Sequence, residues 1–190
     1  TTDAGMRKLL GDLAAAEREH VSLAQKLGEE HLTGDARGAE ATLDRAIEAA
    51  ERARDDVTRA LAWAEMVRVV AVMQHRTADG HTWMKYARAA LSHDPDPSAA
   101  ALLDHMEGLL YNDERAPAEA LALLRRSLEG HRRAHGADDP HLVSVRTDIA
   151  LALEASGRVA EAQLEEEAAL ADARRLFGDA HPRTTRLVNN

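Results

Sequence analysis

The segment "HGADDPHLVSV" at residues 135–145 interrupts a chain that otherwise reads as helix, and "FGDAHPRTTRL" at 177–187 repeats it forty-two residues later. Gly136 and Pro140 of the first copy align with a glycine and a proline of the second. A glycine suits the left-handed position that ends a helix, and Asp139 can cap the next helix. Proline suits the first turn of that helix because its missing N–H has no intrahelical partner there. The two copies therefore predict the same helix–linker–helix junction at two places.

Small residues recur with a similar period and indicate how the helices pack. Such residues occupy three positions of the last unit and the equivalent positions one unit earlier: Ala150, Ala162 and Ala169, then Gly108, Ala120 and Ser127. Two helices approach each other closely only where the side chains between them are small, so one helix contact is expected to recur. Internal repetition with a period near 40 residues is typical of a solenoid.

Apolar periodicity predicts the individual helices and the organisation of the chain. We expect helices near residues 3–10, 12–32, 37–54, 56–76, 79–92, 97–113, 116–134, 140–155 and 159–177. All of residues 1–190 are expected to form one domain. Within it we expect capping or irregular helices at 1–35, repeat units at 36–96, 97–139 and 140–182, and the start of a further repeat at 183–190.

Composition narrows the classes of function. The chain of 190 residues has no cysteine, which excludes disulfides and thiolate metal sites and favours a cytoplasmic setting. Its formal net charge of −9 disfavours nucleic acid as a partner because a phosphate backbone is repelled by an acidic surface. No apolar stretch reaches the roughly 18 residues that a membrane span needs, so no membrane association is expected.

The linker motif and the small-residue positions resemble the tetratricopeptide repeat, in its 42-residue type found in kinesin light chain and in bacterial proteins. The linker of that type typically runs Gly-x-x-His-Pro, which "GDAHP" at 178–182 matches, whereas "GADDP" has Asp139 in place of histidine. The resemblance is strongest over residues 97–190. It implies an all-α fold, a right-handed superhelical solenoid of antiparallel helix pairs, that binds a protein or peptide.

A narrower resemblance concerns residues 61–91 and the segment that follows them. They are similar to the C-terminal repeat regions of bacterial eukaryotic-like serine/threonine kinases, notably those of myxobacteria. The chain has no phosphate loop, His-Arg-Asp loop or Asp-Phe-Gly motif of its own. This resemblance implies a fragment of a larger signalling protein, with a regulatory or self-associating role as the alternative to peptide binding. The effector arm of a large transcription regulator is a further alternative.

Few residues of the sequence suggest metal binding or catalysis. His131 and His135 stand four residues apart, the spacing of a two-histidine metal pair, but two arginines and no carboxylate lie between them. We therefore expect no metal site and no cofactor. Serine and threonine residues lack a histidine and aspartate arrangement that would activate them, so we expect no enzymatic activity. The run at 165–167, three consecutive glutamates, is expected to be a solvated face.

The resemblance also implies where a partner binds, because the first helix of each repeat lines the concave surface of the solenoid. The expected binding positions are Glu65, Val69, Leu102, His105, Leu109, Asn112, Thr147, Leu151 and Glu154. The apolar residues of this set would make hydrophobic contacts with a ligand. The polar residues would form hydrogen bonds with its backbone or with a basic side chain. We expect a hydrophobic and basic peptide or a partner helix. The alternative is that the leucines pack against the neighbouring repeat.

Overall fold

The computed structural model describes residues 36–188, which form helices and contain no strand. The chain divides into two compact units, unit 1 ending at Asp94 and unit 2 beginning at Pro95. The boundary falls inside the proline-rich segment "HDPDPS" at 93–98. Asp96 and Pro97 explain how unit 2 begins: the Asp96 carboxylate accepts a hydrogen bond of 2.7 Å from Ala99 N, and Pro97 is the first residue of the next helix.

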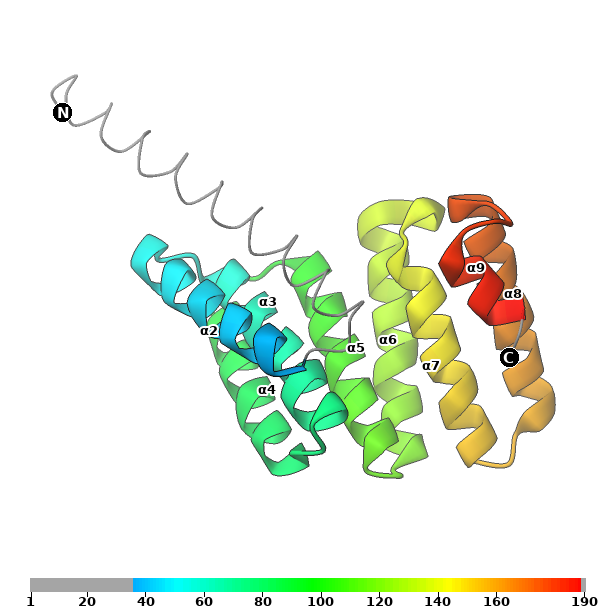
Figure 1. The fold of residues 1–190 in the computed structure, drawn as a ribbon, viewed down its shortest axis with the longest axis horizontal. Coiled ribbons are helices and arrows are strands. Elements are labelled where there is room, and N and C mark those ends of the chain that lie inside the picture. Colours follow the sequence, from blue (N-terminus) through cyan, green and yellow to red (C-terminus); the bar gives the residue numbers. More distant parts are fainter. Residues whose placement is uncertain (1–35, 189–190) are drawn as a thin grey trace, which may run out of the picture. The chain divides into compact units, whose positions relative to one another are not determined.

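Unit 1 contains α2 (Ala36–Ala53), α3 (Asp56–Met66), η1 (Val67–Met73) and α4 (Thr77–Leu91), coloured blue to green in Figure 1. The side chain of Asp55 caps α3 by accepting a hydrogen bond of 2.9 Å from Thr58 N. The helices enclose a core contributed by α2, α3 and η1, composed of Ala39, Leu43, Ala62, Met66, Val69 and Val70.

The segment expected to be one helix over 56–76 changes geometry at its midpoint. Residues Val67–Met73 form a π-helix, and the amide of Arg76 reaches back to the carbonyl oxygen of Val70 at 3.1 Å. This stretch, "VRVVAVM", is rich in β-branched valine, whose side-chain stiffness lowers the propensity for the α-helix. A wider turn rotates the following residues away from the positions that an α-helical spacing predicts.

Unit 2 contains α5 (Pro97–Asp113), α6 (Pro117–His135), η2 (Gly136–Asp138), α7 (His141–Ala155), α8 (Val159–Phe177) and α9 (Pro182–Val188). Short turns join α5 to α6 and α7 to α8, so each pair is an antiparallel hairpin (Figure 1). One core connects the two pairs, since α6, α7 and the start of α8 all contribute to it through Leu124, Leu142, Ile149 and Ala162. The all-α helical repeat fold expected from the sequence is confirmed.

The glycine of the repeated linker adopts a similar backbone conformation in both copies. Gly136 has φ 77° and ψ −159°, and Gly178, forty-two residues later, has φ 84° and ψ 166°. Side-chain-bearing residues rarely adopt this combination, which explains why both copies need glycine. Pro140, not Asp139, is the N-cap residue of α7, but Asp139 Oδ1 still accepts a hydrogen bond of 2.8 Å from the amide of His141, the first residue of the helix.

The recurring small residues lie where helices pack, as the sequence predicted. A Cβ atom built on Gly108 of α5 would lie 2.7 Å from Leu124 of α6, and one built on Gly130 of α6 would lie 2.7 Å from the Cβ of Ala101. Ala120, Ser127, Ala150, Ala162 and Ala169 are all buried. The close approach of α5 and α6 therefore depends on glycine and alanine at the contact.

The expected helices from 37 to 177 are confirmed, apart from the change of geometry in η1. The expected helices at 3–10 and 12–32 lie outside the described residues, and the single domain over 1–190 stays a prediction. No helix within residues 36–188 is long and apolar enough to cross a membrane.

Candidate functional site

The first helices of the two hairpins in unit 2, α5 and α7, meet at Asp148. His105 Nε2 lies 2.7 Å from Asp148 Oδ2, and the side-chain amide of Asn112 donates a hydrogen bond of 3.1 Å to the carbonyl oxygen of Asp148. Leu109 lies between His105 and Asn112 on the same stripe of α5, because residues three or four apart share a helix face. This stripe is therefore held next to α7.

Several expected binding residues on these two helices are accessible to solvent. Leu151 of α7 is 53% exposed, and Glu154 one turn later is also exposed. Leu102, Leu109 and Thr147 are partly exposed. We call the following set the α5–α7 face: Leu102, Leu109, Thr147, Leu151 and Glu154.

Other expected binding residues have different roles. Val69 is only 1% exposed and belongs to the core of unit 1, so the expectation that its side chain grips a ligand is wrong. It lies in the π-helix η1, where the spacing of an α-helical repeat no longer applies. His105 is 4% exposed and pairs with Asp148, and Asn112 is held by the backbone of that residue. These two polar side chains connect α5 to α7 instead of facing a ligand.

Glu65, the remaining expected binding residue, is partly buried on α3. Its carboxylate accepts a hydrogen bond of 2.9 Å from Arg68 Nε, in an ion pair between positions i and i+3. The charge of Glu65 is therefore already balanced within unit 1.

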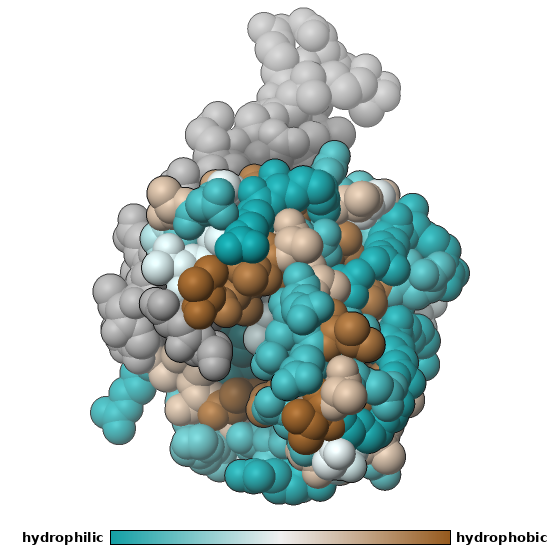
Figure 2. All heavy atoms as spheres, turned by 90° about the vertical axis from the view of Figure 1, so that its right-hand side faces the viewer, coloured by the Kyte–Doolittle hydropathy of each residue, from teal (hydrophilic) through white to brown (hydrophobic). Residues whose placement is uncertain are grey.

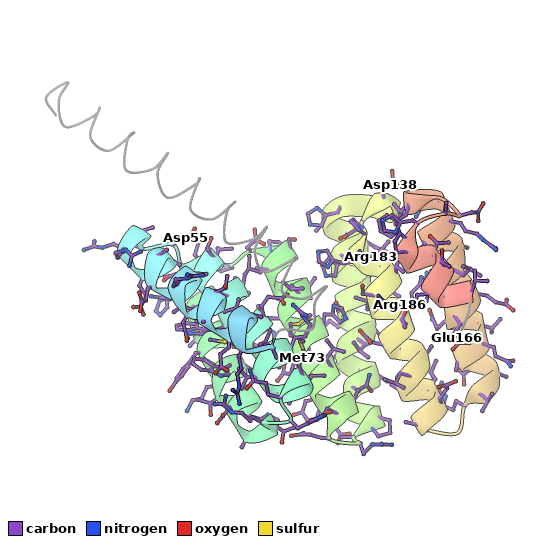
Figure 3. The ribbon with its side chains drawn as sticks, in the orientation of Figure 1. Asp55, Met73, Asp138, Glu166, Arg183 and Arg186 are labelled. Carbon is purple, nitrogen blue, oxygen red and sulfur yellow. The ribbon has the colours of Figure 1, made fainter. Side chains whose placement is uncertain are left out.

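A second group of polar side chains lies at the junction between α6 and α7, at the end of unit 2 marked by Asp138 in Figure 3. The imidazole of His131, which is 1% exposed, donates a hydrogen bond from Nδ1 to Asp139 Oδ2 at 2.8 Å. The ring of His141 stacks on that of His131 with centroids 4.7 Å apart. His135, one turn after His131, is exposed, and its Nε2 lies 2.6 Å from Ser98 Oγ.

Burial lowers the pKa of His131 below its usual range, because the charged imidazolium would lose its hydration. The neighbouring His141 lowers that pKa further, whereas the Asp139 carboxylate raises it and only partly compensates. His131 is therefore neutral at physiological pH. Sequence reasoning noticed the spacing of His131 and His135 but missed Asp139 as their neighbour, since that carboxylate comes from the linker.

An ion-pair network between α7 and α8 was also missed. Arg146 donates hydrogen bonds to Glu165 at 2.5 Å and to Asp172 at 3.1 Å. Glu165 is therefore partly buried and structural, which corrects the expectation that all of 165–167 is solvated. Glu166 is exposed on α8 (Figure 3), and Glu167 is exposed as well.

The end of unit 2 that carries α8 and α9 is mostly hydrophilic, with hydrophobic side chains in separate places (Figure 2).

Part of the chain matches a known protein family, and its fold is similar to that of a solved structure. The family model of the tetratricopeptide repeat matches residues 108–141 and 142–183. No curated protein sequence matches the chain. Among solved structures, the crystal structure of BtubC (BKLC) from P. vanneervenii is similar, with a TM-score of 0.64 at 16% sequence identity. That match covers 92% of this chain and 84% of the other.

These matches agree with the geometry of unit 2, where the second matched segment spans α7 and α8. At 16% identity the structural likeness concerns the fold alone. Neither comparison supports the narrower resemblance to bacterial kinase repeat regions. The chain is an all-α protein with a helical repeat fold, and its residues 108–183 resemble the tetratricopeptide repeat family, whose members generally mediate protein–protein interactions.

Proposed function

We propose that this chain is a non-catalytic binding module that holds a peptide or a partner helix on the α5–α7 face. The observation that carries the proposal is the exposure of Leu151, 53%, on a helix that is otherwise well packed. Val145, Ile149 and Leu153 of the same helix are buried in the core, so α7 cannot turn to hide Leu151. A leucine held in water on a rigid helix is available to a partner.

The polar residues beneath this face make it a rigid platform. His105 and Asn112 both bond to Asp148, which ties the middle of α5 to the middle of α7. A partner that binds across both helices would therefore not have to order them first, and preorganisation of this kind favours affinity.

Charge indicates the chemistry of the partner. Glu154 is exposed beside Leu151, and the chain as a whole has a formal net charge of −9. A ligand with apolar side chains at helical spacing and with lysine or arginine at its edge would match both features. The proposed ligand is thus a hydrophobic and basic segment, bound by a chain that acts in the cytoplasm.

The experiment is to select peptides from a random phage-displayed library against the tag-free chain, then to measure binding of a selected peptide to the Leu109→Asp/Leu151→Asp variant. We expect selected peptides rich in leucine, lysine and arginine, loss of their binding to the variant, and a nearly unchanged melting temperature. A collapse of the melting temperature would show that these leucines are core residues and would contradict the proposal.

Leu164 offers a matched control. It is 65% exposed on α8, the second helix of the same hairpin, and it lies outside the α5–α7 face. The Leu164→Asp variant should bind the selected peptide as tightly as the unchanged chain. Equal loss of binding in Leu164→Asp would indicate nonspecific hydrophobic capture.

The alternative is a regulatory or self-associating segment of a larger signalling protein, such as a bacterial serine/threonine kinase or a large transcription regulator. The two proposals differ in the expected oligomeric state. Light scattering over a range of concentrations should give a monomer if the face binds peptides. A tight dimer that the Leu109→Asp/Leu151→Asp variant dissociates would favour self-association.

A further inference from the structure

The junction between α6 and α7 brings together three side chains that can bind a metal ion. His131 and His135 lie on the last turns of α6, and Asp139 follows in the linker that leads to α7. One ligand atom from each of the three lies within 4.8 Å of the other two. The linker therefore supplies the carboxylate that is missing between the histidines in the sequence.

We propose that His131, His135 and Asp139 form a binding site for a divalent transition-metal ion, with Zn²⁺ as the ion that the donor set fits best. Two imidazole nitrogens and one carboxylate oxygen match the ligand preferences of zinc. Three protein ligands leave the fourth position of a tetrahedral zinc ion to water. Mg²⁺ and Ca²⁺ require mainly oxygen ligands, so neither is expected to bind here.

The protonation of His131 can adapt to a metal ion. His131 Nε2 is buried and makes no hydrogen bond, whereas Nδ1 carries the proton that Asp139 accepts. If the proton moves to Nε2, the Nδ1 lone pair faces the carboxylate of Asp139, whose Oδ2 lies 2.8 Å away. Two acceptors so close together repel each other, and a divalent cation bound by both would remove that repulsion. Zn²⁺ would thus replace the shared proton.

The surroundings hold the three ligands in position. Asp139 also accepts a hydrogen bond from the amide of His141, and Ser98 of α5 holds His135 through Nε2. Outer partners of this kind orient the ligands of metal sites.

The arginine side chains near the three proposed ligands do not prevent a metal ion from binding. Arg132 and Arg133 follow His131 directly, and residues one and two positions apart on a helix do not share a face. Arg133 pairs with Glu129 at 2.9 Å. Arg175 of α8 reaches the linker, where it forms an ion pair with Asp138 and donates a hydrogen bond to the carbonyl oxygen of Ala137. Its charge is balanced by Asp138, so it does not exclude a cation from the three ligands.

The test is isothermal titration of the full, tag-free chain with ZnCl₂ after treatment with a chelator and dialysis. We expect saturable binding of one Zn²⁺ per chain at this site, and no binding of Mg²⁺ under the same conditions. The His135→Ala variant is the most informative change, because His135 is exposed and its loss should leave the fold intact, which circular dichroism checks. Its affinity for Zn²⁺ should fall by about 10–100-fold or more, since that loss is typical even for outer partners of metal ligands.

His93 provides the control, since it is an exposed histidine in unit 1, away from the three ligands in sequence. The His93→Ala variant should bind Zn²⁺ as the unchanged chain does, and Asp139→Asn should weaken binding as His135→Ala does. Equal binding by the chain with and without His135 would overturn the proposal. So would weak binding that every histidine substitution reduces by a similar amount, because that result indicates scattered surface histidines only.

Discussion

The contact between Ala101 of α5 and Gly130 of α6 gives the sharpest test of how this fold packs. A Cβ atom at position 130 would lie 2.7 Å from the Cβ of Ala101, whereas nonbonded carbon atoms prefer a separation of about 3.5–4.0 Å. A Cβ atom is attached directly to the backbone, so no rotamer change can relieve the clash. The Gly130→Ala substitution must therefore push the two helices apart by about 1 Å.

The expected magnitude follows from two opposing contributions. Alanine in place of glycine stabilises a helix interior by about 1 kcal/mol. Overpacking of a well-packed contact costs about 1–3 kcal/mol, and the upper end applies here because the backbone itself must move. We expect Gly130→Ala to lower the free energy of unfolding by about 1–2 kcal/mol. For a chain of this length that corresponds to a decrease in melting temperature of roughly 2–8 °C.

The reciprocal change should repair the contact. In the double variant Ala101→Gly/Gly130→Ala one methyl group still lies between the helices, but it now comes from α6. The helix-propensity changes at the two positions oppose each other, so the double variant should be within about 1 kcal/mol of the unchanged chain. Urea unfolding followed by far-UV circular dichroism measures all of these values. The expected coupling energy between the two positions is about 2 kcal/mol.

Ala122, which is exposed on α6, provides the control for helix propensity alone. Ala122→Gly should cost about 1 kcal/mol, without any contribution from helix packing. The reasoning would be refuted if Gly130→Ala stabilised the chain. It would also be refuted if the effects of the two single substitutions simply added in the double variant.

Three further outcomes follow from the structure. Arg146→Met, which removes the donor shared by two carboxylates between α7 and α8, should lower the free energy of unfolding in urea by about 1.5–3 kcal/mol. Leu124→Ala should cost about 2–5 kcal/mol because its side chain is fully buried, whereas Leu164→Ala on the exposed side of α8 should change stability by less than about 0.5 kcal/mol in the same assay. The lowered pKa of His131 means that unfolding raises its affinity for a proton, so stability should fall as pH decreases below about 6.5, the value for an unfolded histidine. Melting of the metal-free chain at pH values on both sides of 6.5 should show a smaller decrease for His131→Gln, and an equal decrease in both proteins would contradict this origin.

Features that depend on local interactions could be predicted from the sequence. Helix ends are specified by residues close to them in the chain, such as the Asp96 cap, Pro97 in the first turn and the positive φ of Gly136 and Gly178. Apolar periodicity likewise identifies which residues of a helix face the core. For this reason most helix boundaries and the buried small residues were anticipated.

The residues of the candidate site were anticipated less well, because a helix stripe does not reveal which neighbour covers it. His105 was expected to face a ligand, but the approach of α7 buries it against Asp148. Val69 was assigned by a spacing that the π-helix η1 does not keep. Leu151 is exposed whereas Leu153 is buried, because Leu153 lies on the same face of α7 as the buried Val145 and Ile149.

The sequence by itself determined the helices, the repeated linker and the small residues at which helices cross, since each depends on hydrogen bonds or sterics within a few residues. Only the tertiary structure decided which polar side chains meet. Arg146 reaches Glu165 and Asp172 of the next helix, and His131 meets Asp139 where the chain folds back. These partners are brought together by packing, and the free energy of burying a charge or an imidazole depends on where packing places its partner.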